Sequence, residues 1–363
     1  MTRQSQTRLL PTSTAGSLPK PSWLAQSETL WSPWKLTGEE LADGKRDALR
    51  LSLVDQLEAG LDIVGDGEQT RQHFVTTFIE NLLGVDFENR TVVRIRDRYD
   101  AAVPQVVGTV SRAAPVFVDD ARFLREHTDR PIKWALPGPM TMVDTLFDAH
   151  YGSREKLAWE FAGILNEEAK DLAAAGVDIV QFDEPAFTVF HEEANDWGIA
   201  ALERAAECLS CERAVHICYG YGIEANTNWK KTLGSEWRQY EATLPILQRS
   251  SIDILSLERH NSRVPVDLME LARGKKLMIG AIDVATSTIE TPDEVAATLR
   301  AVLPFVDADK LYPSTNCGMA PLASTVARGK LAALCAGAEI VRSEITDAAG
   351  TPFASSGAVR SDE

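Results

Sequence analysis

A histidine and a cysteine lie two residues apart in a short apolar segment. The segment AVHICYG, residues 214–220, places His216 and Cys218 among branched and small side chains. On a β-strand, residues i and i+2 point to the same face, so these two side chains would lie side by side. A well-packed strand is one interpretation of this pattern. The other is half of a metal site, which needs two more ligands from elsewhere in the chain.

Two other segments end in residues that could supply those ligands. Glu258 lies near the end of IDILSLER (252–259), and Cys317 near the end of KLYPSTNCG (310–318). One imidazole, two thiolates and one carboxylate suit tetrahedral Zn²⁺, whereas Mg²⁺ and Ca²⁺ prefer oxygen ligands alone. Each residue also has a structural alternative, such as a small buried cysteine or an ion pair of Glu258 with Arg259. Taken together, the four predict one zinc ion per chain, held by His216, Cys218, Glu258 and Cys317.

The segments that carry these residues belong to a repeating pattern. Short apolar runs alternate with longer amphipathic stretches such as 37–60, 154–176 and 291–306, which favours strands alternating with helices. Eight strands predict a closed (β/α)₈ TIM barrel, and no GxGxxG follows the first run to favour an open doubly wound sheet. The stretch 85–120 interrupts the pattern and is predicted to be a hairpin-like excursion. The runs are 9–17, 61–68, 131–138, 177–185, 213–220, 252–259, 275–283 and 310–318.

Ionisable residues gather at the C-terminal ends of these runs. Glu68, Asp183 and Asp283 each end one of them, in addition to the four candidate metal ligands. Active sites of barrels form at that end of the strands. We therefore expect the catalytic residues at this rim, although salt bridges with arginine are an alternative role for the acids. The remaining cysteines do not fit the site. Cys208 and Cys211 form a CxxC pair in a predicted helix without a partner pair, and Cys335 lies in an amphipathic helical pattern typical of core.

The composition limits the classes of partner and the location. The chain has 363 residues and a net charge of −16, which disfavours nucleic acid and anionic lipid as partners. No apolar run approaches the roughly 18 residues of a membrane span, and the first residues lack the apolar core of a signal peptide. We therefore expect a cytoplasmic enzyme with a single barrel domain over 1–346 and a flexible tail over 347–363.

Seven motifs along the chain resemble those of one enzyme family. They are STAGSLPKP, DGEQTR, PGPMT, DEPA, HICYG, SLERHNSR and STNCGM, and from about Leu9 to Ile345 they are similar to the catalytic barrel of cobalamin-independent methionine synthase. The resemblance implies transfer of a methyl group to the zinc-bound thiolate of L-homocysteine, giving L-methionine. It implies the four zinc ligands above, with Glu68 and Asp183 at the amino acid part of homocysteine. It places Ala15 and Ser17 at the substrate carboxylate and gives Asp283 no defined role.

Two positions depart from the folate-using members of that family. Thr145 stands where they have a tryptophan that stacks on the folate ring, and Ala285 stands where they have the histidine proposed to protonate the departing folate. The chain is thus similar to the short, folate-independent branch. The resemblance leaves the methyl donor open, with a methyl-corrinoid protein or another partner protein as candidates. The 85–120 excursion is a candidate docking surface for it.

Other functions remain open from the sequence alone. A zinc-dependent alkyltransferase acting on another thiol, such as coenzyme M, would share the metal chemistry but would not need Glu68 and Asp183. A non-catalytic homocysteine-binding accessory protein would keep the site without a donor. A metal-free barrel of the uroporphyrinogen decarboxylase type is the remaining alternative.

Overall fold

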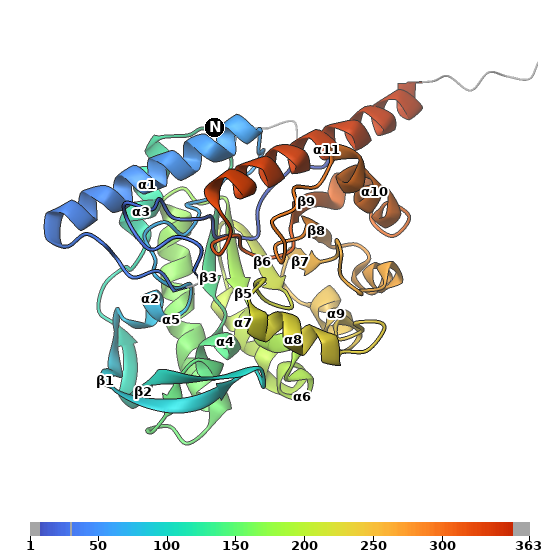
Figure 1. The fold of residues 1–363 in the computed structure, drawn as a ribbon. Coiled ribbons are helices and arrows are strands. Elements are labelled where there is room, and N and C mark those ends of the chain that lie inside the picture. The colour runs from blue at the N-terminus through green and yellow to red at the C-terminus, as the bar shows by residue number, and fades with distance from the viewer. Residues whose placement is uncertain (1–7, 30, 351–363) are drawn as a thin grey trace, which may run out of the picture.

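A computed structural model of the protein describes residues 8–29 and 31–350. Its centre is a sheet of six parallel strands in the order β3-β5-β6-β7-β8-β9, surrounded by helices (Figure 1). Each strand overlaps one of the predicted runs. The strands are β3 (Lys133–Pro137), β5 (Ile179–Asp183), β6 (Glu212–Ile217), β7 (Ile254–Glu258), β8 (Lys276–Ile282) and β9 (Leu311–Thr315).

The two N-terminal runs close this sheet into a barrel. The backbone N–H of Ser13 donates to the carbonyl of Pro313 at the edge strand β9, at 3.0 Å. Ile63 N–H donates to the Thr12 carbonyl at 3.0 Å, and Lys133 N–H donates to the Val64 carbonyl at 2.8 Å. Residues 12–13 and 62–64 therefore occupy the two remaining strand positions between β9 and β3, although each makes too few bonds to form a regular strand. The prediction of a (β/α)₈ barrel is confirmed.

The outer helices follow the start and stop signals of the sequence. Helix α1 ends at Ala59, and the next residue, Gly60, has a φ of 89°, the left-handed conformation that glycine adopts easily. Helix α10 begins after Thr291, which forms a capping box with Glu294. The helices are α1 (Gly38–Ala59), α2 (Thr76–Ile79), α3 (Val118–Glu126), α4 (Pro139–Asp144), α5 (Arg154–Ala174), α6 (His191–Glu193), α7 (Ile199–Ala205), α8 (Glu224–Thr232), α9 (Tyr240–Arg249), α10 (Pro292–Val302) and α11 (Ser324–Gly350).

Side chains inside the barrel change from apolar to polar along the strands. A buried apolar cluster fills one end, and its members are Ile63, Ile179, Ala214, Ile254, Met278 and Tyr312. Two residues further along β5, β6 and β7, on the same face, lie the buried polar side chains of Gln181, His216 and Ser256. Inward-facing side chains recur every two residues along each strand, so the barrel interior changes from an apolar layer at one end to a polar layer. The polar layer lies next to the residues at the rim.

The predicted excursion is a long antiparallel hairpin. Strands β1 (Leu82–Ile95) and β2 (Tyr99–Arg112) pair with each other, and β2 also pairs in parallel with the short strand β4 (Phe147–Asp148). At its tip, Arg96 and Asp97 both have positive φ, of 46° and 55°, which tightens the turn. In Figure 1 the hairpin crosses the lower side of the molecule and its tip lies near α8. It covers part of the rim where the active site was expected.

The last helix extends past the predicted end of the domain. Helix α11 continues to Gly350, so residues 347–350 of the predicted tail are helical, and residues 351–363 lie outside the described part of the chain. Over residues 8–29 and 31–350, no helix is both long and apolar enough to cross a membrane. The cytoplasmic location stays a prediction.

The CxxC pair lies in a turn, and its predicted helical position is wrong. Helix α7 ends at Ala205, and Cys208 is exposed with a φ of 57°. Cys335 lies in α11, where its Sγ is 3.7 Å from the hydroxyl of Thr12. All five cysteines of the chain are described and none forms a disulfide.

Candidate metal centre and active site

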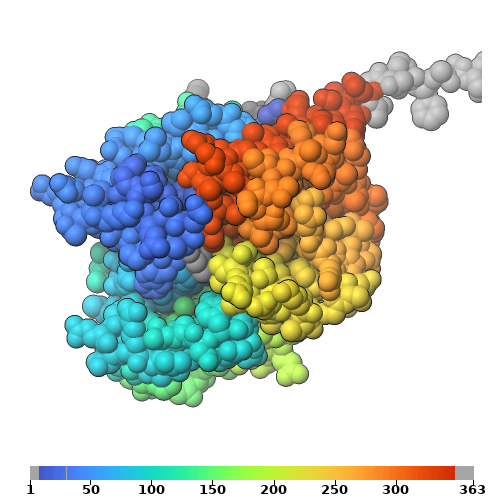
Figure 2. Space-filling view, in the orientation of Figure 1, coloured from blue at the N-terminus to red at the C-terminus, as the bar shows by residue number. Residues whose placement is uncertain are grey.

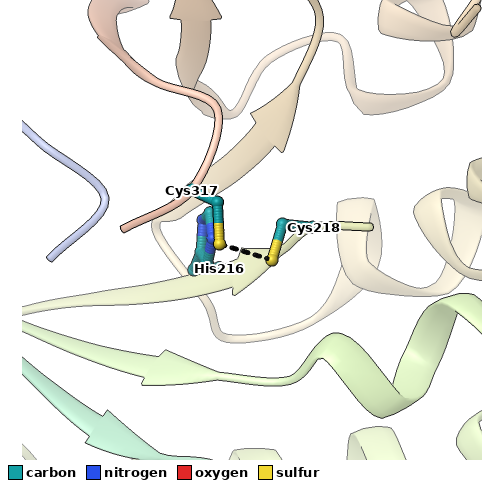
Figure 3. Close-up of side chains that lie close together, drawn as sticks. All are labelled: His216, Cys218 and Cys317. Carbon is teal, nitrogen blue, oxygen red and sulfur yellow. Dashed lines mark hydrogen bonds between the residues drawn. The ribbon is translucent and has the colours of Figure 1, made fainter. Parts of the chain in front are cut away.

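Three of the four predicted metal ligands meet at the rim of the barrel. His216 lies on β6, Cys218 directly follows that strand, and Cys317 lies in the loop after β9 (Figure 3). One ligand atom from each lies within 4.8 Å of the others, and the two sulfur atoms are 3.3 Å apart. All three side chains are buried. Cys218 and Cys317, 99 positions apart in the chain, thus meet His216 in one compact set of nitrogen and sulfur donors. These three residues are the metal-binding group.

The hydrogen bonds of His216 leave one ring nitrogen available. Its Nδ1 lies 2.8 Å from the hydroxyl of Ser256, which fixes the orientation of the ring. Its Nε2 is buried and has no hydrogen-bond partner. A buried polar atom without a partner is costly, and histidine ligands to metals usually bind a second group through the other nitrogen. The donor set and this free nitrogen both fit a zinc ion.

The pKa values of the two thiols, Cys218 and Cys317, are shifted in opposite directions. Their shared hydrogen bond lowers the pKa of Cys218 well below its ordinary value, and His216 adds to the effect. The same hydrogen bond, together with burial, raises the pKa of Cys317 well above its ordinary value. The pair therefore loses its first proton readily and holds the second strongly. A cation bound beside both sulfur atoms would allow both thiols to ionise.

Glu258 is buried at the same rim but does not join the other three ligand atoms. Its Oε1 accepts a hydrogen bond from the ammonium of Lys230 at 2.7 Å, and its Oε2 accepts one from the Tyr219 N–H at 3.0 Å. Burial raises the pKa of Glu258, and Lys230 opposes that rise. The carboxylate is thus paired with a cation of the protein, and its role as fourth ligand stays a prediction.

Two predicted acids lie in the same cavity as the metal-binding group. Glu68, Asp183 and His216 all line it. Asp183 ends β5, and its Oδ1 accepts a hydrogen bond from the Gln181 amide at 2.8 Å. Gln181 is in turn held by the buried ammonium of Lys133 at 2.7 Å. The polar layer inside the barrel therefore fixes the orientation of Asp183 and brings a positive charge near it.

The N-terminal loop also lines this cavity. Ala15 and Ser17 line it, and the Ala15 carbonyl accepts a hydrogen bond from Lys133 at 3.0 Å. Their role at the substrate carboxylate stays a prediction. The hydroxyl of Ser17 donates to the Tyr221 hydroxyl at 3.4 Å. At Gly318 a Cβ would lie 2.1 Å from the Ser17 hydroxyl oxygen, so only glycine permits this close approach of the two loops.

The sequence model described as the catalytic domain of cobalamin-independent synthase matches residues 10–339. The chain belongs to the cobalamin-independent methionine synthase family. It is therefore an enzyme, and its class is methyltransferase. The match includes the metal-binding group, both acids and the N-terminal loop.

Individual relatives agree with this assignment. A methionine synthase from Saccharolobus solfataricus is 29% identical over 346 residues, which span 94% of this chain and 97% of that protein. One from Saccharolobus islandicus is 31% identical over 346 residues, with the same coverage of both chains. The solved structure of a B12-independent methionine synthase from Shewanella sp. W3-18-1, in complex with selenomethionine, is 75% identical. It has a TM-score of 0.92 and covers 93% of this chain and 99% of that one.

Asp283 does not reach the cavity of this family member. It directly follows β8, is half-buried, and does not line the cavity that holds the metal-binding group. Its Oδ1 accepts a hydrogen bond from the Ala285 N–H at 2.8 Å, and its Oδ2 accepts one from the Asn261 amide at 3.4 Å. The observed contacts indicate that Asp283 shapes the loop after β8.

Glu184, the neighbour of Asp183, supports the fold next to the site. Its carboxylate accepts hydrogen bonds from the N–H groups of Met140 and Thr141, each at 2.9 Å, and from the Thr141 hydroxyl at 2.7 Å. A Cβ at Gly138 would lie 2.2 Å from the Glu184 carboxyl carbon, so the PGPMT and DEPA motifs fit together only with glycine there.

Replacing Glu184 by glutamine is expected to lower the free energy of unfolding by about 1–3 kcal/mol, because the new amide group would face backbone donors instead of accepting from them. Urea unfolding of the two proteins measures this. Metal content should be unchanged, since Glu184 does not line the cavity. An unchanged urea midpoint would contradict the structural role.

Several residues at the site were not predicted from the sequence. Tyr221 and Asn226 lie in the segment that follows HICYG, and both line the cavity. Arg98 reaches in from the hairpin, where it donates to the Tyr219 carbonyl at 3.1 Å and to the Asn226 amide oxygen at 3.2 Å. Tyr221 could have been found as the second aromatic residue of CYGY after the ligand pair. No local pattern in the sequence marks Arg98, because its role depends on where the hairpin folds.

Proposed function

We propose that this protein transfers a methyl group to the thiol of L-homocysteine to give L-methionine, using a zinc ion held by His216, Cys218, Cys317 and Glu258. The observation that carries the proposal is the shared cavity, in which nitrogen and sulfur donors lie beside two buried carboxyl groups. The Shewanella relative was solved with selenomethionine, the selenium analogue of the proposed product, and this supports the same substrate class.

Each wall of the cavity has a distinct role in this proposal. Glu68 and Asp183 hold the substrate ammonium, and the Ala15–Ser17 loop binds its carboxylate, so that the thiol points toward the metal-binding group. A free thiol has a pKa of roughly 8.5 and is mostly protonated at neutral pH. Bound zinc would supply a Lewis acid that keeps the substrate thiol ionised without redox chemistry. The sulfur then attacks the methyl carbon in line with the leaving group.

The loop after β8 bears on the methyl donor. Ala285 packs against Gly222, where an added Cβ would lie 2.5 Å from the Ala285 Cα. This position offers no side chain able to protonate a leaving group. We therefore propose that methyltetrahydrofolate is not the direct donor, and that the methyl group comes from a source whose leaving group needs no proton there.

A competition assay tests the acceptor. Purified protein loaded with zinc is given equal amounts of homocysteine and coenzyme M with a chemical methyl donor, and both products are measured. Preferential formation of methionine supports the proposal. Preferential methylation of coenzyme M would identify a different thiol alkyltransferase. No enzymatic turnover with tight homocysteine binding would favour the accessory protein instead.

The affinity for homocysteine is expected to depend on pH through Glu68. Burial raises the pKa of Glu68 to about 7, with Arg71 opposing the rise and Asp183 adding to it. Only the ionised carboxylate can pair with the substrate ammonium, so KM for homocysteine should fall as the pH rises from 6 to 8. Ionisation of the substrate thiol also changes over this pH range. Glu68→Gln controls for this, because the variant should lose only the part of the pH dependence of KM that is due to the Glu68 carboxylate. The same pH dependence of KM in both proteins would contradict this role.

The same group should affect the stability of the substrate-free protein. The pKa of Glu68 is higher in the folded protein than its ordinary value of 4.5. Stability from this group is therefore present at low pH and is lost as the pH rises from about 4.5 to about 7.

A further inference from the structure

A groove lies between the start of α11, helix α1 and the N-terminal loop. Its volume is about 180 Å³, which suits a ligand smaller than the usual drug-sized molecule. Figure 2 shows the red start of α11 beside the blue N-terminal part of the chain on this face of the molecule. The groove shares no lining residue with the cavity that holds the metal-binding group, so it is a separate place for a ligand.

Half of the residues that line the groove are apolar. Leu51 of α1 is 50% exposed, which is unusual for a side chain of its size. Covering these residues would release water from apolar surface, and this favours a ligand with an apolar chain. The apolar lining residues are Leu18, Pro19, Pro21, Ala48, Leu51 and Leu331.

Gln69 brings an unpaired acceptor to the groove. The residue lines the groove and is only 1% exposed. Its amide nitrogen donates to the carbonyls of Leu18 at 3.1 Å and Gly67 at 3.0 Å, whereas its Oε1 has no hydrogen-bond partner among the described residues. A buried acceptor without a partner is costly, so a ligand that donates a hydrogen bond there would be stabilised.

The groove also contains one charge of each sign. Nη1 of Arg328 lies 3.5 Å from Oδ1 of Asp55, which is longer than a normal hydrogen bond. The two side chains are 53% and 30% exposed, and an ion pair of this kind contributes little to stability. A ligand with charges of both signs can therefore pair with Asp55 and Arg328 at a small cost to the protein.

The first turn of α11 adds a second feature that favours an anion. Helix α11 begins at Ser324, and both Ser324 and Ala327 line the groove. The first N–H groups of a helix have no partner within the helix, and the helix dipole favours negative charge at this end. Arg328 lies one turn further along the same helix, so a carboxylate in the groove meets two sources of positive charge.

These features together select the class of ligand. An α-amino acid carries its ammonium and its carboxylate on one carbon, close together as the charges of Arg328 and Asp55 are. We propose that the groove is a second binding site of this protein and that it takes a free α-amino acid with a small apolar side chain. The ammonium pairs with Asp55 and with Oε1 of Gln69. The carboxylate pairs with Arg328 and the first turn of α11, and the side chain covers Leu51.

The groove and the cavity are lined by neighbouring residues of the same two segments. Ser17 and Glu68 line the cavity, whereas the residues that follow them, Leu18 and Gln69, line the groove. The Leu18 N–H donates to the Gly67 carbonyl at 2.9 Å, which joins the two segments. An amino acid in the groove therefore contacts the segments of the substrate site without entering the cavity.

The test counts molecules of L-methionine bound per chain, by equilibrium dialysis of the zinc-loaded protein with radiolabelled ligand. The choice of L-methionine rests on the proposed function, of which it is the product, whereas the groove itself does not. The variants are Arg328→Met, Arg328→Lys, Asp55→Asn and Asp183→Asn, the last of which weakens binding in the cavity. Arg300→Met is the matched control, because it removes an exposed arginine that pairs with Glu344 of α11 away from the groove.

Wild type is expected to bind two molecules per chain, and Asp183→Asn should keep the one in the groove. Adding Arg328→Met or Asp55→Asn to Asp183→Asn should weaken this remaining binding by about 10-fold or more, since a charged hydrogen bond is lost. Arg328→Lys should retain part of it, and Arg300→Met should retain all of it. In the Asp183→Asn protein, L-norleucine should compete with L-methionine. L-methionine methyl ester and 4-(methylthio)butanoate, which each lack one charge, should not compete.

The results separate this proposal from the proposed function. A single molecule per chain that is lost in Asp183→Asn overturns the groove site and leaves the proposed acceptor intact. Binding that depends on Arg328 but never on Asp183 supports the groove and counts against the acceptor. A second molecule that is insensitive to both Arg328→Met and Asp55→Asn overturns the assignment to the groove. So does a dimer in sedimentation that dissociates in Leu51→Asn, since the groove would then be an interface between copies. Thermal unfolding of each variant shows whether a loss reflects misfolding.

Discussion

Replacing Cys317 by serine is expected to abolish zinc binding and to reduce methyl transfer by about 10³-fold or more. Cys317 contributes one of the two sulfur atoms, 3.3 Å from the other, and a neutral hydroxyl cannot replace a thiolate as a zinc ligand. Loss of metal-assisted ionisation of the substrate thiol removes several kcal/mol of stabilisation, and each 1.4 kcal/mol or so corresponds to a factor of ten in rate. Zinc content by mass spectrometry and the rate of methionine formation measure both effects.

The matched control for this variant is Cys208→Ser. Cys208 is exposed and lies in the turn after α7, away from the cavity lining, so its replacement should change neither zinc content nor rate. If Cys317→Ser retained a full equivalent of zinc and its activity, Cys317 would be an ordinary buried cysteine. The prediction that His216, Cys218 and Cys317 bind zinc would then be wrong.

Replacing Asp183 by asparagine is expected to lower kcat/KM for homocysteine by about 100-fold while leaving zinc content unchanged. Asp183 is buried, and Gln181 orients its carboxylate toward the cavity. A charged hydrogen bond to the substrate ammonium is worth about 1.5–3 kcal/mol, and leaving a buried charge without its partner costs more. The loss should appear mainly as a rise in KM, because the contact exists in the bound substrate as well as in the transition state.

A thiol without an amino group provides the internal comparison for Asp183→Asn. The rate with 3-mercaptopropionate, poor in the wild type, should change little in the variant, because that substrate has no ammonium to lose. Selectivity for homocysteine over 3-mercaptopropionate should therefore collapse. Equal losses with both thiols would show that Asp183 supports the structure of the site without recognising the amino group.

Much of the fold could be predicted because barrel strands have a regular pattern. The alternation that places Gln181 and Asp183, or His216 and Cys218, on one face follows from the period of two, and it locates the rim without any tertiary information. Cys317 could be proposed as a metal ligand because cysteine is rare in this chain and because, like the other runs, its run has a possible ligand at the C-terminal end. The two irregular segments at 12–13 and 62–64 were also recognisable as strands, since barrel closure demands them even where few backbone bonds form.

Other features depend on contacts that no local pattern records. Position at a strand end placed Asp283 at the rim, but the loop after β8 turns its carboxylate to the N–H of Ala285. The sequence around Glu258 does not indicate its ion pair with Lys230, because Lys230 lies on a different element, α8. Arg96 enters the site only because the hairpin folds back over the barrel, and its backbone has a positive φ that the sequence does not signal.

The most direct measurement is the X-ray absorption spectrum of the zinc-loaded protein, recorded before and after addition of homocysteine. Before homocysteine is added, the spectrum should fit a zinc ion bound by two sulfur atoms and lighter donors. Homocysteine should add one sulfur atom to the zinc ligands. Cys317→Ser should show neither the original zinc–sulfur ligation nor the added sulfur atom. A spectrum that does not change with homocysteine, or a protein that retains no zinc, would contradict the assignment of His216, Cys218 and Cys317 as the centre of a thiol methyltransferase.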